Sequence, residues 1–111
     1  MNLKESIQRQ LSEFLSLCKS HGVKTIYAFG SSVNNSFNDE TSDFDLLIEL
    51  ESEDPIIRGE NLMSIWDKLE VLFQRKIDLL TSASIRNPVL KRRIDATKIL
   101  IYDGKEQKVS I

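Results

Sequence analysis

Two aspartates, Asp43 and Asp45, flank Phe44 at the start of an apolar run that ends at Leu50. In a β-strand, residues two apart point to the same face, so both carboxylates would emerge together. Adjacent carboxylates repel and raise each other's pKa unless a cation lies between them. Magnesium prefers oxygen ligands and keeps substrate phosphates in its shell, so the pair suits a metal ion that carries a nucleotide. Two ordinary acids on a solvent-facing strand edge would give the same pattern.

A third acid, Asp78, interrupts the apolar run KIDLL between Ile77 and Leu79. A carboxylate that is buried without a partner costs several kcal/mol, so Asp78 should lie at an edge or near a cation. If residues 76–80 lie beside residues 43–50, Asp78 completes a cluster of three carboxylates. Two metal ions held there could clamp the attacking and leaving oxygens of an in-line displacement. Taken alone, Asp78 is better explained as a structural residue, and it becomes informative only together with Asp43 and Asp45.

Gly30 and Ser31 directly follow a third apolar segment, residues 23–29. Glycine permits a tight turn and lets a phosphate approach the backbone closely. The side chains of Ser31 and Ser32 and the amides that follow could hold phosphate oxygens, particularly if residues 32–36 start a short helix. A simple strand-ending turn would look the same, so this motif gains meaning only from the acids that follow it.

The elements that must position these residues follow from hydrophobic periodicity. Helical spacing of apolar residues predicts helices over residues 3–20 and 57–74, and Pro88 can begin another that runs to about residue 96. An Asn2–Glu5 capping box would start the first helix, and Gly22 would end it. Short runs rich in branched residues predict strands at 23–29, 43–50, 76–80 and 99–102. This order predicts an α/β (α+β) fold, a small mixed sheet with flanking helices.

Composition limits the class of protein. The sequence has 111 residues, and we expect one domain over residues 1–111 with a polar, frayed tail at about 104–111. The formal net charge of −2 argues against a broad grip on nucleic acid. Cys18 is the only cysteine, and no stretch approaches the ~20 apolar residues that span a bilayer. We therefore expect a cytoplasmic protein that does not bind membranes.

Together, Gly30-Ser31, the run SDFDLLI and the run KIDLL resemble the DNA polymerase β-type nucleotidyltransferases, and most closely the minimal nucleotidyltransferases of bacteria and archaea. The resemblance extends from about residue 23 to 102. It implies the polymerase β-like fold, with Gly30, Ser31 and Ser32 at the triphosphate of ATP. It also implies that Asp43, Asp45 and Asp78 bind two Mg²⁺ ions and that Asp78 helps to activate a hydroxyl. That hydroxyl would attack the α-phosphorus and release pyrophosphate.

The same resemblance implies a partner protein. Many minimal family members are encoded beside a HEPN-type protein, and characterised pairs form type VII toxin–antitoxin systems. In those pairs the nucleotidyltransferase is the antitoxin and adenylylates a tyrosine of the HEPN ribonuclease toxin. A chain of 111 residues has no second lobe to hold an acceptor, which favours a protein substrate and a homo- or hetero-oligomer. An RNA or small-molecule acceptor is the less favoured alternative.

One departure from the family pattern concerns the turn after Gly30-Ser31. The family usually continues with an arginine-bearing turn, whereas this chain continues with Ser32-Val33-Asn34-Asn35 and has no arginine before Asp43. A missing arginine removes a possible phosphate contact. The sequence therefore also fits an antitoxin that neutralises its partner by binding alone.

Five further features have plainer interpretations. We expect His21 to be a solvated histidine at a helix end, Cys18 to lie in the core, and Trp66 to be a core or partner contact. The run Lys91-Arg92-Arg93 predicts a solvated helix face that could also meet phosphate or an acidic partner. The acids between Glu49 and Asp54 predict a solvated turn, or a docking surface for a basic partner.

Overall fold

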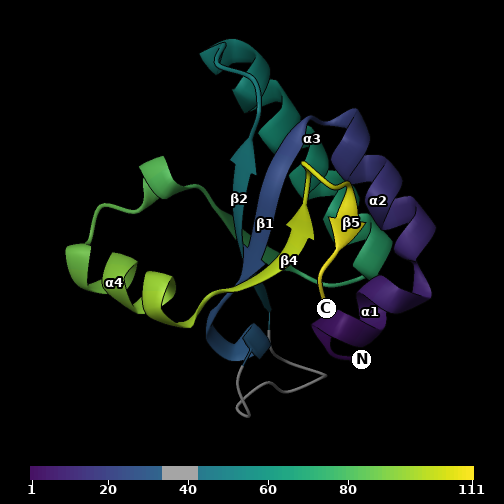
Figure 1. Ribbon diagram of the computed structural model, residues 1–111, viewed down its shortest axis with the longest axis horizontal. Coiled ribbons are helices and arrows are strands. Elements are labelled where there is room, and N and C mark those ends of the chain that lie inside the picture. Colours follow the sequence, from purple (N-terminus) through teal and green to yellow (C-terminus); the bar gives the residue numbers. More distant parts are fainter. Residues whose placement is uncertain (34–42) are drawn as a thin grey trace.

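A five-stranded mixed sheet forms the centre of the protein, seen here in a computed structural model that describes residues 1–33 and 43–111 (Figure 1). The strand order is β3-β2-β1-β4-β5, in which β2 and β3 are parallel and the other neighbours are antiparallel. The strands are β1 (Val23–Ala28), β2 (Phe44–Leu50), β3 (Ile77–Leu80), β4 (Ile99–Asp103) and β5 (Lys108–Val109). The predicted α+β fold with a mixed sheet is confirmed.

Four α-helices flank the sheet: α1 (Leu3–Arg9), α2 (Leu11–Ser20), α3 (Pro55–Phe73) and α4 (Pro88–Thr97). Three of these helices start at a side-chain cap. The Asn2 side chain caps α1 in the predicted capping box, and Asp54 and Asn87 cap α3 and α4, which both begin at a proline. Gly22 follows α2 with a φ of +62°, a backbone conformation that favours glycine.

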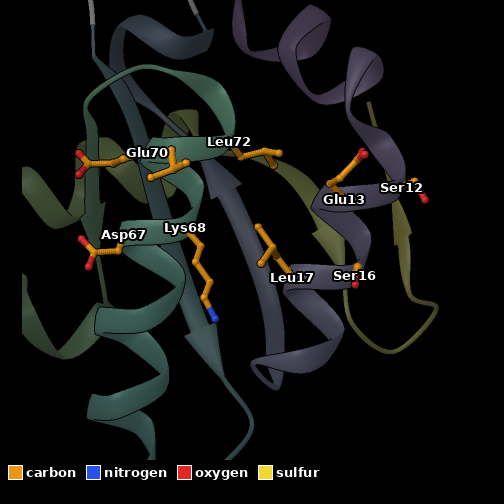
Figure 2. Close-up of a pocket in the computed structure, with 9 residues that line it drawn as sticks. Ser12, Glu13, Ser16, Leu17, Asp67, Lys68, Glu70 and Leu72 are labelled. Carbon is orange, nitrogen blue, oxygen red and sulfur yellow. The ribbon is translucent and has the colours of Figure 1, made fainter.

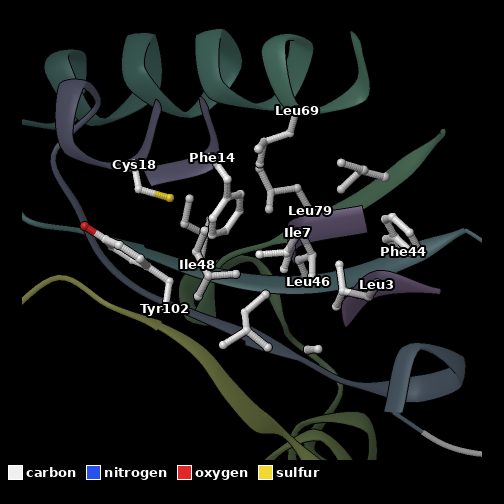
Figure 3. Close-up of a cluster of buried hydrophobic side chains, with 14 of the residues drawn as sticks. Leu3, Ile7, Phe14, Cys18, Phe44, Leu46, Ile48, Leu69, Leu79 and Tyr102 are labelled. Atoms are coloured by element: carbon white, nitrogen blue, oxygen red, sulfur yellow. The ribbon is translucent and has the colours of Figure 1, made fainter. Parts of the chain in front are cut away.

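One face of the sheet carries the main core, which α1, α2 and α3 cover (Figure 3). Phe44, Leu46 and Ile48 alternate along β2 and are fully buried against this helical layer. Cys18 lies in the same core, as predicted, and its burial raises the pKa of the thiol to about 12. Trp66 packs against the core and donates a hydrogen bond from Nε1 to the Ile77 carbonyl at 2.8 Å.

A smaller apolar cluster lies on the opposite face of the sheet. It joins Phe29, which follows β1, and Leu47 of β2 to Ile94 of α4. Because Leu47 alternates with the core residues Leu46 and Ile48, α4 lies on the face that the other three helices leave open. Figure 1 shows α4 on the left, away from α1, α2 and α3. The sheet therefore has a helical face and a more open face.

Three sequence expectations need correction. The predicted helix over 3–20 is divided at Gln10, whose φ of −130° breaks the helix and whose side chain donates to the Leu72 carbonyl at 2.7 Å. The tail expected to fray instead forms β5, which pairs with β4 and places Val109 and Ile111 against the core. Apolar side chains at these two positions explain why the tail folds back.

His21 is the third correction, because it is buried rather than solvated. Its Nδ1 lies 2.8 Å from the Leu17 carbonyl, and its Nε2 lies 2.9 Å from the Ser64 hydroxyl. A carbonyl only accepts, so Nδ1 carries the proton and Nε2 accepts from Ser64. His21 thus ties the end of α2 to α3. Among the described residues, no helix is long and apolar enough to cross a membrane.

Candidate functional site

The turn after β1 begins the candidate site. Gly30 has a φ of +61° and opens a 3-10 helix that spans Gly30–Val33. The Phe29 amide donates to the Asp45 carbonyl at 3.1 Å, which fixes the turn beside the start of β2. The sequence allowed either a short helix over residues 32–36 or a simple turn; the residues beyond Val33, with Asn34-Asn35, lie outside the described residues.

Asp45 is the carboxylate that the turn holds. The Ser31 hydroxyl donates to Asp45 Oδ2 at 3.4 Å, and the Asp45 amide donates to the Ser32 hydroxyl at 2.8 Å. A Cβ atom added to Gly30 would come within 2.8 Å of Asp45 Oδ2. Only glycine therefore lets the turn and the carboxylate approach this closely, in a conformation that side chains rarely adopt.

Asp78 lies beside Asp45 across the parallel pair β2–β3, in which Asp45 and Asp78 are register partners. Both side chains lie on the open face, because they alternate with the core residues Phe44, Leu46, Ile77 and Leu79. Burial raises the pKa of Asp45, and the nearby charges of Asp78 and Asp43 raise it further, whereas the Ser31 hydrogen bonds lower it. Asp45 and Asp78 are thus neighbours across the strand pair, and the metal-binding roles of the three aspartates stay predictions.

Asp43 lies one residue before β2 and is partly exposed. Its Oδ2 lies 3.9 Å from Lys76 Nζ, a contact that sequence reasoning missed although Lys76 is only two residues from Asp78. Within residues 1–33 and 43–111, no three His, Cys, Asp or Glu side chains form a ready-made metal cluster. The donor chemistry nevertheless fits a divalent cation, since Asp45 is a partly buried oxygen ligand repelled by two other carboxylates.

The helical face has a hollow of about 900 Å³ between α2 and α3. Figure 2 shows Leu17, Lys68 and Leu72 extending from the two helices into this space. Its lining residues belong to α2 and α3 and include neither the three predicted aspartates nor the Gly30–Val33 turn. This hollow is therefore separate from the candidate site.

The mixed sheet brings the glycine–serine turn beside Asp45 and Asp78 of two neighbouring strands. Residues 9–102 match the sequence model of the family described as "Nucleotidyltransferase domain". The chain belongs to this nucleotidyltransferase family.

Two curated proteins of Methanocaldococcus jannaschii are similar to this chain in sequence. One named "Putative protein adenylyltransferase" is 33% identical over 99 residues, which cover 89% of this chain and 94% of that protein. A second protein with the same description is 34% identical over 85 residues, which cover 77% of this chain and 83% of that protein. The similarity thus extends over most of both chains.

Solved structures share the fold at lower identity. A "putative minimal nucleotidyltransferase" superposes with a TM-score of 0.61 at 24% identity, covering 89% of this chain and 95% of that one. A chain of a toxin–antitoxin complex with AMP-PNP superposes with a TM-score of 0.58 at 20% identity, covering 86% of this chain and 76% of that one. A chain of the Shewanella oneidensis complex of a tri-AMPylated HEPN toxin with an MNT antitoxin gives 0.50 at 19% identity, covering 89% and 74%.

Proposed function

We propose that this protein is an antitoxin that transfers AMP from ATP to a tyrosine hydroxyl of a HEPN-type toxin protein. The observation that carries the proposal is the register pairing of Asp45 with Asp78 beside the Gly30-Ser31 turn. The family match, the names of the archaeal relatives and the toxin–antitoxin complexes among the structural neighbours support it.

The proposed reaction forms one bond and breaks one. The tyrosine oxygen attacks the α-phosphorus of ATP, the bond from that phosphorus to the bridging oxygen breaks, and pyrophosphate leaves. Asp78 is the exposed carboxylate of the pair and is suited to accept the tyrosine proton. The Gly30–Val33 turn would hold the triphosphate through its amides and the hydroxyls of Ser31 and Ser32.

Asp43, Asp45 and Asp78 would hold Mg²⁺, which when bound offsets the negative charge of the phosphates and of the leaving pyrophosphate. Asp45 is the residue best prepared for this role, because burial and the charges of its neighbours disfavour its ionised form when no cation is near. Ser31 would keep the Asp45 carboxylate oriented through the hydrogen bond that joins them.

The direct test uses ATP labelled at either the α- or the γ-phosphorus. The purified protein is incubated with Mg²⁺, each labelled ATP and the protein encoded by the adjacent gene. AMP transfer predicts that only the α-label reaches that protein, and that tandem mass spectrometry places AMP on a tyrosine. Replacing that tyrosine by phenylalanine should remove the label.

A binding-only antitoxin is the second candidate, favoured by the absence of arginine between Ser31 and Asp43. It predicts a complex that forms without ATP, no transfer of label, and full protection of cells by the Asp43→Asn variant. Labelling of a purified RNA or metabolite without any protein acceptor would contradict both candidates.

A further inference from the structure

Helix α4 packs against the rest of the protein with only a small part of its surface. Of its ten residues, Ile94 is buried and the other nine are exposed. An isolated helix shorter than about 12–15 residues is marginal in water, and packing of one face normally stabilises it. The apolar residues Val89 and Leu90 remain 52% and 41% exposed. A helix with so much uncovered surface is suited to contact another molecule.

The charge of this helix is opposite to that of the chain. Residues 86–98 contain five cationic side chains and a single carboxylate, in a chain with a formal net charge of −2. That carboxylate, Asp95, pairs with Lys98 at 3.1 Å. In the part of the chain that the structure describes, no carboxylate pairs with the other four, which are Arg86, Lys91, Arg92 and Arg93. Positive charge is therefore concentrated on α4 and at its two ends.

The outward face of α4 combines this charge with an apolar side chain. Val89, Arg92, Arg93 and Ala96 follow the spacing i, i+3, i+4 and i+7, so they form one stripe on the side roughly opposite to Ile94. All four are exposed. We call these four residues the α4 surface. Its chemistry fits a protein surface with carboxylates around a small apolar patch.

The position of α4 connects this surface to the candidate site. Ile94 packs with Phe29 and Leu47. Phe29 immediately precedes Gly30, and Leu47 lies two residues after Asp45. The helix also contacts the Gly30–Val33 turn. Helix α4 therefore lies beside the residues that we propose hold the triphosphate, and a protein bound to the α4 surface would be separated from them by the width of one helix.

We propose that the α4 surface is the docking site for the acceptor protein, whose complementary surface is acidic with an apolar centre. This inference rests on the proposed function, which identifies the bound protein as the acceptor. Arginine is enriched in the energetically dominant contacts of protein interfaces, which agrees with Arg92 and Arg93 beside Val89. The docked acceptor would then present its hydroxyl to the open face of the sheet.

The test separates binding from transfer by using the Asp45→Asn variant as the common background. The protein encoded by the adjacent gene is titrated against this variant without ATP, and hydrogen exchange is measured on the complex. We expect slower exchange of the α4 amides in the complex. Arg92→Glu and Val89→Glu should each weaken binding by about tenfold or more, the range of dominant interface residues.

Lys19→Glu is the matched control, because it makes the same charge change at an exposed residue of α2, on the helical side of the sheet. It should leave the affinity within about twofold, as exposed charges outside an interface contribute little. Circular dichroism should show no loss of helix in any variant, since glutamate has a helix propensity similar to that of arginine and lysine and higher than that of valine.

Several results would overturn the inference. It is wrong if the adjacent protein does not bind, if it binds without protecting α4, or if Arg92→Glu and Val89→Glu leave the affinity unchanged. It is also wrong if Arg92→Glu weakens only ATP binding, or only binding of a fluorescent oligouridylate, because α4 would then serve phosphates or RNA. If α4 docks the protein but no label moves, the proposed transfer fails and the docking surface stands.

Discussion

Asp45 on β2 and Asp78 on β3 are register partners in a parallel strand pair, and both face the open side of the sheet. Cross-strand neighbours of like charge destabilise a sheet. Burial of Asp45 adds to this cost, and its pKa is raised accordingly. The arrangement therefore lowers stability, and its effects on stability and on the proposed AMP transfer can be measured separately.

The Asp45→Asn variant should be more stable than the wild type near neutral pH without metal ions. A carboxyl whose pKa is raised in the folded state loses stability as the pH rises from its usual value of 3.8 through the raised value. Asparagine avoids this loss. Because the pair is partly exposed, we expect a gain of only about 0.5 kcal/mol, or about 2 °C in melting temperature.

Calorimetric melting at a series of pH values checks this expectation. The stability difference between Asp45→Asn and the wild type should be present at neutral pH and shrink toward zero below pH ~3.5, where both side chains are neutral. A variant that melts below the wild type at every pH would show that the ionised carboxylate stabilises the fold.

Asp45→Asn and Asp78→Asn should each lower AMP transfer by on the order of 100-fold or more, because a metal ligand supplies several kcal/mol of transition-state stabilisation. Initial rates with α-labelled ATP measure the effect. Asp67→Asn, the same substitution at an exposed residue of α3, is the control and should retain the wild-type rate. Equal rates in all three variants would remove Asp45 and Asp78 from the catalytic machinery.

Gly30→Ala and Gly22→Ala form a matched pair, since the two glycines have φ values of +61° and +62°. A Cβ at Gly22 meets nothing within 4 Å, whereas one at Gly30 collides with the Asp45 carboxylate. Both variants should lose about 1 kcal/mol from backbone strain, measured by urea unfolding. Only Gly30→Ala should also lose transfer activity; if Gly22→Ala loses as much, displacement of Asp45 is not the cause.

Ser64→Ala should destabilise the protein by about 1–3 kcal/mol, because it leaves the buried His21 Nε2 without its hydrogen-bond donor. Ser16→Ala, at an exposed position of α2, should change the free energy of unfolding by less than about 0.5 kcal/mol. Urea unfolding measures both. A smaller loss in Ser64→Ala than in Ser16→Ala would mean that water replaces the serine hydroxyl.

Sequence patterns predicted the parts of the fold that depend on local chemistry. Alternation along β2, the capping box at Asn2 and the proline that begins α4 all act within a few residues, and the structure confirms them. The helix predicted over 57–74 begins two residues earlier, at Pro55. The place of Asp78 was predicted only conditionally, because register between β2 and β3 depends on how α3 returns the chain to the sheet.

The wrong expectations share a physical reason, which is contact between distant residues. His21 is buried because Ser64, 43 residues away, satisfies it. The helix break at Gln10 is accompanied by a side-chain hydrogen bond to Leu72, 62 residues away, at a position with neither glycine nor proline. The α4 helix was expected, but its contact with the Gly30–Val33 turn follows from the packing of Ile94 on Phe29 and Leu47.

Alternation along β2 has a consequence for how this protein can change over time. The side chains of Phe44, Leu46 and Ile48 must fit the packing of three helices. Those of Asp43 and Asp45 must instead fit whatever occupies the open face. Substitutions at the two sets are therefore filtered by different requirements, although the residues are neighbours in the chain. A lineage could therefore replace the aspartates and keep the folded core.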